Sequence, residues 1–221
     1  MKGRKLRGAI CLAWLALTLA ACSSPPRSAI ILCAGDSLTE RGYPRHLTRL
    51  LNQSGVRVRV RNYGRSGFTS GEYLKFLEAG RAKLEAERPD FVLLQLGTND
   101  VRLDGDRTPI EAFENHMRRI IGIFSGFRTR WNRRPRILLA SIPPVPEDTG
   151  FPFSPESAVR VREEINPVLK RLSFELRLPL VDNFTLFRDS PRLLRDIHPT
   201  EEGYRLMAAN WQAGLQPFLG R

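Results

Sequence analysis

Residues 28–44 read SAIILCAGDSLTERGYP, and the way this stretch ends decides the fold class. The apolar run 30–34 stops at Gly35-Asp36-Ser37, which predicts a buried strand followed by a polar turn. Two interpretations of the turn are open. It is an ordinary connection, or it holds a nucleophilic hydroxyl at the tip of a strand.

Four further apolar segments predict strands, at 56–62, 90–96, 136–141 and 178–182, with helix-length amphipathic stretches between them. Strands that alternate with helices predict an α/β protein with a parallel sheet covered on both faces. Segment 56–61 alternates valine with arginine. We interpret it as an edge strand that turns charge outward, in preference to a nucleic-acid patch.

Helix signals occupy the gaps between these strands. Several start signals are capping residues followed by proline or glutamate. The expected helices run from Tyr43-Pro44 to about Asn52, from a Ser70 cap to Leu77, over 81–88, from a Thr108 cap to about Arg130, from Ser154-Pro155 to Arg177 with a kink at Pro167, and from a Thr200 cap to about Phe218.

The first residues indicate export. Basic residues precede the apolar stretch 8–21, as in a secretory signal, and Leu19-Ala20-Ala21-Cys22 resembles the lipobox of bacterial lipoproteins. We expect a signal peptide at 1–21, a lipidated tether at 22–28 that begins with Cys22, and one domain at 29–221. The expected location is the bacterial cell envelope, on the outer membrane or cell surface. An ordinary signal peptide or a short retained anchor remains the alternative.

The formal net charge is +12, and four of the cations lie in the expected signal. No nucleic-acid module is visible, so we interpret the basic excess as a face toward a membrane or an acidic glycan. The three cysteines suggest no disulfide, because Cys11 lies in the signal, Cys22 would carry lipid, and Cys33 lies in the first strand as a small core residue.

Polar clusters follow the predicted strands at the point where each one ends. They are Gly35-Asp36-Ser37-Leu38-Thr39, the segment from Asn62 to Gly67, Gly97-Thr98-Asn99-Asp100, and Asp196-Ile197-His198-Pro199 before the last helix. Ligands of open parallel sheets bind beyond the carboxyl ends of the strands. Each cluster alone is typical of a turn, but together they predict a site.

In these four blocks the sequence resembles the SGNH (GDSL) hydrolase family. The resemblance implies a three-layer α/β/α sandwich around a five-stranded parallel sheet, with a flavodoxin-like strand arrangement. It implies that Ser37 is the nucleophile and His198 its general base, and that no cofactor is needed. It also implies an oxyanion hole made by the backbone N–H groups of Ser37 and Gly64 and the side-chain amide of Asn99.

The sequence departs from the family at the acid. The family pattern has aspartate three residues before the histidine, where this chain has Arg195, whereas Asp196 is two residues before it. We expect Asp196 to orient His198, because such triads are defined by geometry. Asp189 or a backbone carbonyl is the alternative.

Other polar residues have simpler interpretations. We expect His46 and His116 to be surface or half-buried helix residues and find no metal-ligand spacing among the histidines. Asp36, Asp100, Ser66 and Ser70 are interpreted as turn or cap residues. The proline-rich loop 142–153, with Phe151 and Phe153, forms either a wall of the substrate cleft or a packed surface loop. The apolar stripe of the last helix, which includes Trp211, is expected in the core.

The function implied by the resemblance is hydrolysis of carboxylic esters through an acyl-enzyme. We expect short acyl substrates, above all acetyl esters, including acetyl groups on glycans. Lysophospholipase or thioesterase action on longer chains is the enzymatic alternative, and a catalytically silent glycan-binding lipoprotein is the alternative from another class.

Overall fold

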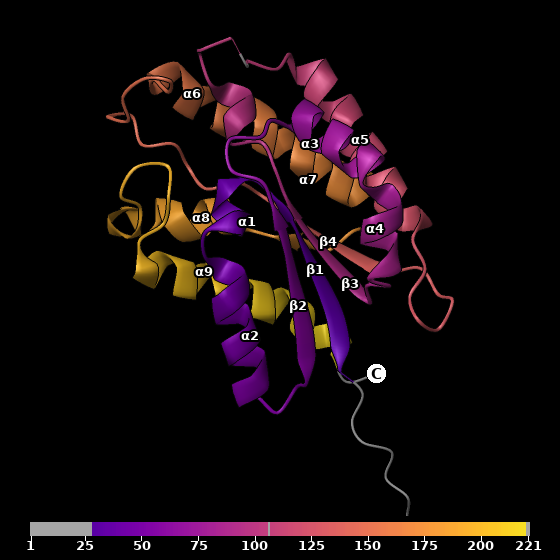
Figure 1. Ribbon diagram of the computed structural model, residues 1–221. Helices are drawn as coiled ribbons and strands as arrows, with labels where there is room; N and C mark the ends of the chain where they lie inside the picture. The colour runs from indigo at the N-terminus through magenta and orange to yellow at the C-terminus, as the bar shows by residue number, and fades with distance from the viewer. Residues whose placement is uncertain (1–27, 106, 220–221) are drawn as a thin grey trace, which may run out of the picture.

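A computed structural model describes residues 28–105 and 107–219. Five parallel strands form one sheet in the order β2-β1-β3-β4-β5, as the sequence predicts. The order places the first strand beside the third, so the chain passes from one half of the sheet to the other next to β1 (Figure 1). The strands are β1 (Ala29–Gly35), β2 (Val58–Gly64), β3 (Phe91–Gln95), β4 (Arg136–Ala140) and β5 (Leu180–Val181).

The burial of the strands confirms their predicted positions. Every residue of β3 is buried, and so are the last four residues of β4, since helices cover both faces of the sheet. β2 lies at the edge and pairs only with β1. Its Arg59 is exposed, and its Arg61 forms an ion pair with Glu87, which confirms the edge-strand interpretation.

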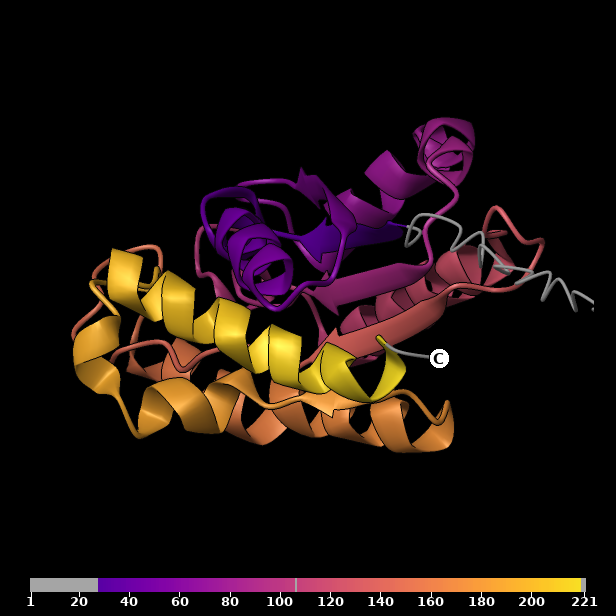
Figure 2. The same ribbon diagram turned by 90° about the horizontal axis from the view of Figure 1, so that it is seen from below.

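Helices form a layer on each face of the sheet (Figures 1 and 2). Each layer encloses its own hydrophobic cluster, and alternate strand residues such as Leu32 and Cys33 belong to opposite clusters. One face is covered by α3 (Ser70–Ala79), α4 (Arg81–Ala86), α5 (Ile110–Gly126), α6 (Pro155–Arg160) and α7 (Asn166–Glu175), and the other by α2 (Tyr43–Gln53), α8 (Asn183–Arg188) and α9 (Glu201–Leu215).

Two predicted helix starts are displaced by one residue each. The N-cap of α3 is Thr69, which exchanges hydrogen bonds with Glu72, and not Ser70. α5 begins at Ile110 and has Pro109 as its N-cap, and it ends at Gly126 because the next residue is extended. Thr200 caps α9 as predicted, by accepting a hydrogen bond from the N–H of Gly203.

The expected disturbance at Pro167 takes the form of a π-helical turn, η2 (Val161–Ile165), between α6 and α7. A proline ring cannot donate a backbone hydrogen bond and crowds the carbonyl one turn earlier, so the wider turn accommodates it. The sequence did not predict the short elements α1 (Ser37–Glu40), α8, η1 (Asn99–Val101), η3 (Pro191–Leu193) and η4 (Gln216–Phe218).

The core contains the residues that the patterns placed there, with one correction. Cys33 is buried and has no disulfide partner among the described residues, and Trp211 of α9 is fully buried. The interpretation of His46 as a surface or half-buried residue is wrong, because only 3% of it is exposed. It lies on the inner side of α2, next to Glu201 of α9.

The expected signal peptide, Cys22 and most of the tether lie outside the described residues. Within the part of the chain that the structure describes, no helix has the length and apolar character needed to cross a bilayer.

Candidate active site

The site lies at the carboxyl ends of β1, β2 and β3, where the polar clusters were expected to meet. Ser37 is the first residue of α1, directly after the turn that ends β1. The preceding Asp36 is the N-cap of this short helix and accepts a hydrogen bond from the N–H of Leu38 at 2.9 Å. This local capping holds Ser37 at the strand tip, where only 3% of it is exposed.

A tight loop before α9 brings His198 to Ser37. Residues Leu194 and Pro199 form an antiparallel bridge, and the N–H of Arg195 donates to the carbonyl of His198 at 3.0 Å. The loop therefore doubles back on itself and directs the imidazole toward Ser37. The Nε2 atom of His198 lies 3.0 Å from the hydroxyl oxygen of Ser37.

The same loop delivers the carboxylate despite the shorter spacing. Asp196 Oδ1 accepts a hydrogen bond from the backbone N–H of His198 at 2.6 Å and lies 2.9 Å from its Nδ1. Since a carboxylate accepts and does not donate, this contact assigns the ring proton to Nδ1 and leaves Nε2 to accept the serine proton. Asp189, the alternative, instead pairs with Arg188.

The electrostatic environment suits a neutral imidazole beside a charged carboxylate. Burial lowers the pKa of His198 below its usual value, against the opposing attraction of Asp196. Burial acts to raise the pKa of Asp196, but hydrogen bonds from the backbone and ring of His198 outweigh it and hold that pKa below its usual range. At neutral pH the pair is therefore able to accept a proton from Ser37.

Asn99 begins η1 after β3 and is buried. Its Nδ2 group donates one hydrogen bond to the carbonyl of Phe68 at 3.0 Å, which leaves a second N–H on the same nitrogen. The neighbouring Asp100 accepts hydrogen bonds from the backbone N–H and the hydroxyl of Ser70, the latter at 2.6 Å. These contacts connect the loop after β3 to the start of α3.

Gly64 is the last residue of β2, and its backbone N–H already has an acceptor. Its N–H already donates to Asn62 Oδ1 at 3.0 Å. A Cβ atom at this position would lie 2.3 Å from the backbone nitrogen of Glu40, so glycine is needed here for the close approach of β2 to α1. These two contacts argue against the expected role of Gly64 as an oxyanion donor.

The structure draws attention to Gly67, to which the sequence patterns assigned no role. Phe68 donates to the carbonyl of Arg65 at 3.2 Å, and Gly67, with φ of +80°, is the third residue of this turn. This is the position at which a type II turn demands glycine. Among the described residues, no acceptor takes its N–H, and nothing lies within 4 Å of where a Cβ would be. In the sequence, the signal for this position was the second glycine of the block from Asn62 to Gly67.

Two buried carboxyl groups lie behind these residues. Burial raises the pKa of Asp36 to about 7, and burial also raises the pKa of Asp100. Their contacts confirm the interpretation as turn and cap residues: Asp36 caps α1, and Asp100 binds the start of α3. Ser70 lies 3.0 Å from Nδ1 of the half-buried His116, so α5 joins the same network.

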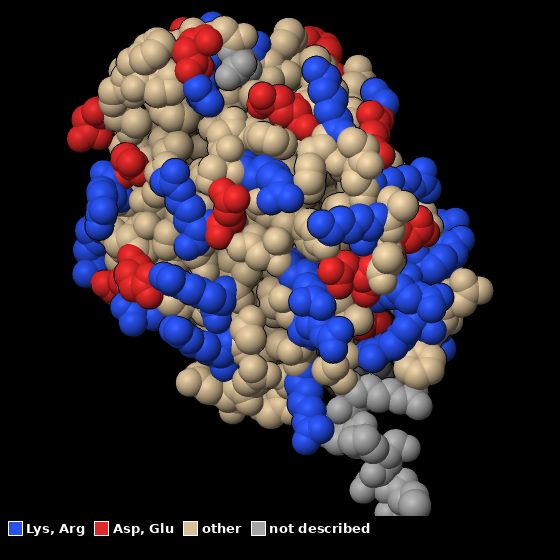
Figure 3. All heavy atoms as spheres, in the orientation of Figure 1, with Lys and Arg blue, Asp and Glu red and all other residues tan. Residues whose placement is uncertain are grey.

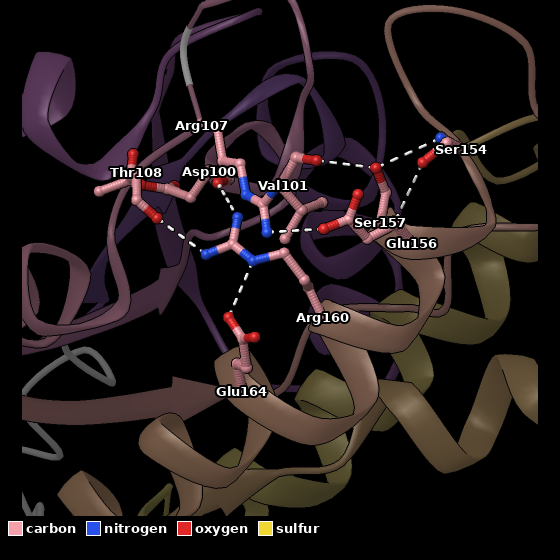
Figure 4. A network of polar contacts seen from close by, with 9 residues as sticks. All are labelled: Asp100, Val101, Arg107, Thr108, Ser154, Glu156, Ser157, Arg160 and Glu164. Carbon is pink, nitrogen blue, oxygen red and sulfur yellow. Dashed lines mark hydrogen bonds and ion pairs between the residues drawn. The ribbon is translucent and has the colours of Figure 1, made fainter.

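Side chains of α6 donate hydrogen bonds to the backbone of the loop that follows Asn99 (Figure 4). Arg160 is buried and donates to the carbonyl oxygens of Asp100 at 3.0 Å and Thr108 at 2.8 Å, while the hydroxyl of Ser157 donates to the carbonyl of Val101 at 2.7 Å. At the rim, Arg107 forms an ion pair with Glu156. Both ends of the loop are therefore fastened to one helix.

The proline-rich loop 142–153 has one phenylalanine packed in the core and another exposed to solvent. Phe153 is buried in the core, whereas 78% of Phe151 is exposed. The carbonyl of Pro152 accepts a hydrogen bond from Leu103, which joins this loop to the one that follows Asn99. Within residues 28–105 and 107–219, no three acidic, histidine or cysteine side chains gather as a metal site would require.

The fold and the site define the class of protein: a three-layer α/β/α sandwich whose serine, histidine and aspartate meet beyond the carboxyl ends of the strands. A family model described as the GDSL-like lipase/acylhydrolase family matches residues 33–206. The chain belongs to this family, which is one of carboxylic ester hydrolases.

One similar curated protein is an isoamyl acetate-hydrolyzing esterase of Schizosaccharomyces pombe, which is 33% identical over 87 residues. The match spans 38% of this chain and 35% of that esterase, so the chain spans about a third of the length of this relative.

Solved structures resemble the whole fold. The lipase/acylhydrolase of Enterococcus faecalis has a TM-score of 0.70 at 24% identity, over 86% of this chain and 97% of that one. The acetylxylan esterase Axe2 of Geobacillus stearothermophilus has a TM-score of 0.67 at 19% identity, over 85% and 94%. A carbohydrate acetylesterase family member from Sinorhizobium meliloti has a TM-score of 0.69 at 19% identity, over 87% and 100%. These likenesses show the shared three-layer fold.

Proposed function

We propose that this protein is a serine esterase that cleaves carboxylic esters through an acyl-enzyme. The observation that carries the proposal is the chain of contacts from Ser37 Oγ to His198 Nε2 at 3.0 Å and from His198 Nδ1 to Asp196 at 2.9 Å. Ser37 attacks the ester carbonyl while His198 takes its proton. His198 then protonates the leaving alcohol. Water next attacks the acyl-enzyme while His198 takes a proton from it, and His198 returns that proton to Ser37 as the acid is released.

The negative charge that forms on the carbonyl oxygen needs fixed donors. We assign this role to the backbone N–H of Ser37, the second amide hydrogen of Asn99 and the N–H of Gly67, in place of Gly64. The support for Gly67 is that its N–H has no acceptor among the described residues and that Asn99 is bonded to the adjacent Phe68. Loss of one such donor typically reduces turnover about 10²- to 10³-fold.

For the substrate we infer short acyl esters, and acetyl esters first, including those on glycans. The support comes from the relatives, one of which hydrolyses isoamyl acetate and another of which is an acetylxylan esterase. Variants of the latter described as catalytic mutants replace a serine and an aspartate, which agrees with the roles proposed for Ser37 and Asp196.

A panel of p-nitrophenyl esters from acetate to palmitate tests the activity and the chain-length preference together. We expect kcat/KM to be highest for acetate and to fall steeply beyond butyrate. Ser37→Ala is the control, and it should remove nearly all turnover, since only binding and the oxyanion donors remain.

The other outcomes have definite meanings. A preference for long chains would favour lysophospholipase or thioesterase action over the deacetylase proposal. An absence of Ser37-dependent turnover at every chain length would contradict the esterase proposal and favour a glycan-binding protein.

We also propose that the protein works at the bacterial cell envelope, held there by lipid on Cys22. The support is the basic and apolar order of residues 1–21 and the position of Cys22 behind them. The substrate would then be an ester of the envelope or of the medium around the cell.

A further inference from the structure

The end of the molecule opposite the site carries a group of exposed arginines around a groove. The basic end face, as we name it, consists of Arg57, Arg133, Arg134 and Arg136, which surround a groove at the amino ends of β1, β3 and β4. All four side chains are exposed, and none forms an ion pair with a described residue. Among the described residues that line this groove, Asp90 is the single acid, and it lies 3.5 Å from Arg130. Figure 3 shows Lys and Arg side chains gathered at the lower right, beside the start of β1.

Apolar groups lie among these charges. Half of Trp131 is exposed at the tip of the loop between α5 and β4, with the Arg130 guanidinium 5.7 Å from its ring centre. Arg136 lies 4.1 Å from the ring centre of Phe218, which also lines the groove. Tryptophan and arginine together are the residues that favour the boundary between lipid headgroups and acyl chains. A site for a soluble anion would need only the arginine charges and not the exposed aromatic side chains.

The described chain begins at this same face. Ser28 precedes β1, and its carbonyl accepts a hydrogen bond from Arg130. The six residues 23–28 separate Cys22 from β1 and extend at most about 20 Å. If lipid is attached to Cys22, this short segment keeps the basic end face, and not the catalytic end, next to the bilayer.

We propose that the basic end face docks on a membrane surface rich in anionic phospholipid. The arginines contact the headgroup phosphates and Trp131 enters the headgroup layer. Because β1 is seven residues long, about 20 Å separates this face from Ser37. The active site then points away from the membrane, toward esters in the aqueous phase and not toward lipids of the supporting bilayer.

Vesicle binding by the chain that begins at Ser23 tests the docking surface without the lipid. This chain keeps every residue that the structure describes, including both core clusters. We expect it to sediment with vesicles of equal parts phosphatidylcholine and phosphatidylglycerol, and not with pure phosphatidylcholine. High salt should release it, since screening shortens the range of the attraction.

The tryptophans provide a local signal for contact at this face. The chain from Ser23 has two, the half-exposed Trp131 and the fully buried Trp211. Trp131 emission should shift to the blue and resist acrylamide quenching when anionic vesicles are added. Unchanged Trp131 emission in the bound state would overturn the proposal, because the protein would then be bound through another surface.

Two triple variants with the same loss of charge separate docking from general basicity. Arg57→Gln, Arg133→Gln and Arg134→Gln together should weaken vesicle binding roughly a hundredfold, at about fivefold for each charge. The matched control combines Arg162→Gln, Arg188→Gln and Arg192→Gln, which are exposed and lie in segments after the carboxyl ends of β4 and β5. An equal loss in both variants would contradict a dedicated face.

Two further readouts complete the test. Both triple variants should hydrolyse p-nitrophenyl acetate at the rate of the parent chain, so a failure of the esterase proposal and a failure of docking are seen in separate assays. If soluble dextran sulfate protects Trp131 as well as the anionic vesicles do, the face binds an acidic polysaccharide and the membrane assignment is wrong.

Discussion

Asp196 shows how a local backbone turn replaces a sequence spacing. It lies two residues before His198, yet one of its oxygens binds both the backbone N–H and the ring of that histidine. The bridge between Leu194 and Pro199 closes the loop and makes the shorter spacing sufficient. No pattern of residue types predicts this contact, because it depends on the path of the backbone.

Substitution of this aspartate tests its role. Asp196→Asn should lower kcat by up to about 10⁴-fold, because the amide cannot hold the Nδ1-protonated ring in the same way. Loss of the carboxylate also removes an attraction that raises the pKa of His198, so the acid limb of the kcat/KM profile should move to lower pH. Steady-state kinetics across pH measures both effects.

Asp189→Asn is the matched control, since Asp189 pairs with Arg188 on the surface. It should leave both the rate and the acid limb unchanged. A loss as large as that of Asp196→Asn would assign the orienting carboxylate to Asp189.

Asp36 makes the stability of the protein depend on pH. Its pKa is raised from 3.8 to about 7 in the folded state by burial. The folded protein therefore keeps a proton that the unfolded chain releases, and the stability that this proton supplies is present below about pH 4 and lost as pH rises to about 7. Asp36→Asn cannot ionise, and its side-chain oxygen can still cap α1.

The expected result is a difference between two curves. As pH rises from 4 to 7, the unfolding free energy of Asp36→Asn should increase relative to that of the parent chain, by at most roughly 4 kcal/mol. Urea denaturation at several pH values measures it. Parallel curves would mean that Asp36 is charged in the folded protein at neutral pH.

At the scale of elements, α6 supports the loop after β3 at both of its ends. Arg160 satisfies two carbonyl oxygens of this loop, and Ser157 satisfies a third. The loop carries Asn99, so the packing of α6 fixes the position of the side chain that we propose as an oxyanion donor. The sequence marked Ser154-Pro155 as a helix start but contained no signal that this helix would support the site.

Removal of the guanidinium tests this support. Arg160→Met should lower the free energy of unfolding by roughly 3 kcal/mol, because buried carbonyl groups lose their partners. The catalytic effect should be a lower kcat for p-nitrophenyl acetate with little change in KM, since a misplaced Asn99 affects the transition state more than binding. Urea denaturation and steady-state kinetics measure the two effects.

Glu164→Gln is the control for this element. Glu164 is the ion-pair partner of Arg160, and its side chain is 40% exposed, so its loss should cost less than about 1 kcal/mol. A decrease in kcat equal to that of Arg160→Met would show that the ion pair, and not the bonds to the loop, holds Asn99.

The elements themselves were largely predictable. Five apolar segments with helical stretches between them predicted the sheet, and the valine and arginine alternation predicted its edge strand, because burial on one or two faces leaves a direct pattern in the sequence. β5 is two residues long where five were expected. The short helices were missed, since one turn has no periodicity to detect.

At the scale of the whole molecule, the two ends of the sheet carry different chemistry. The carboxyl ends hold the polar site, and the amino ends hold arginines and an exposed tryptophan. Parallel strands make this separation possible, because all loops of one kind emerge at the same edge. The proposed anchor at Cys22 would act at the arginine-rich end.

Cys22→Ala tests the anchor in a bacterial host. The parent protein should stay in the membrane fraction after a high-salt wash, because acyl chains are held by the hydrophobic effect and not by charge. The variant should be released by the same wash, since only the basic end face then remains to bind. Equal retention of both proteins after the wash would refute lipidation of Cys22.

The sequence by itself determined the fold class and the order of the five strands along the chain, and it marked Ser37, His198 and Asn99 as candidate site residues, because buried strands and the polar blocks that follow them are local features of the chain. Only the tertiary structure decided that Asp196 reaches His198, that the N–H of Gly64 is occupied while that of Gly67 has no acceptor in the described chain, and that α6 holds the loop of Asn99. These three depend on which backbone groups already have hydrogen-bond partners, and the partners lie between 2 and 60 residues away along the chain.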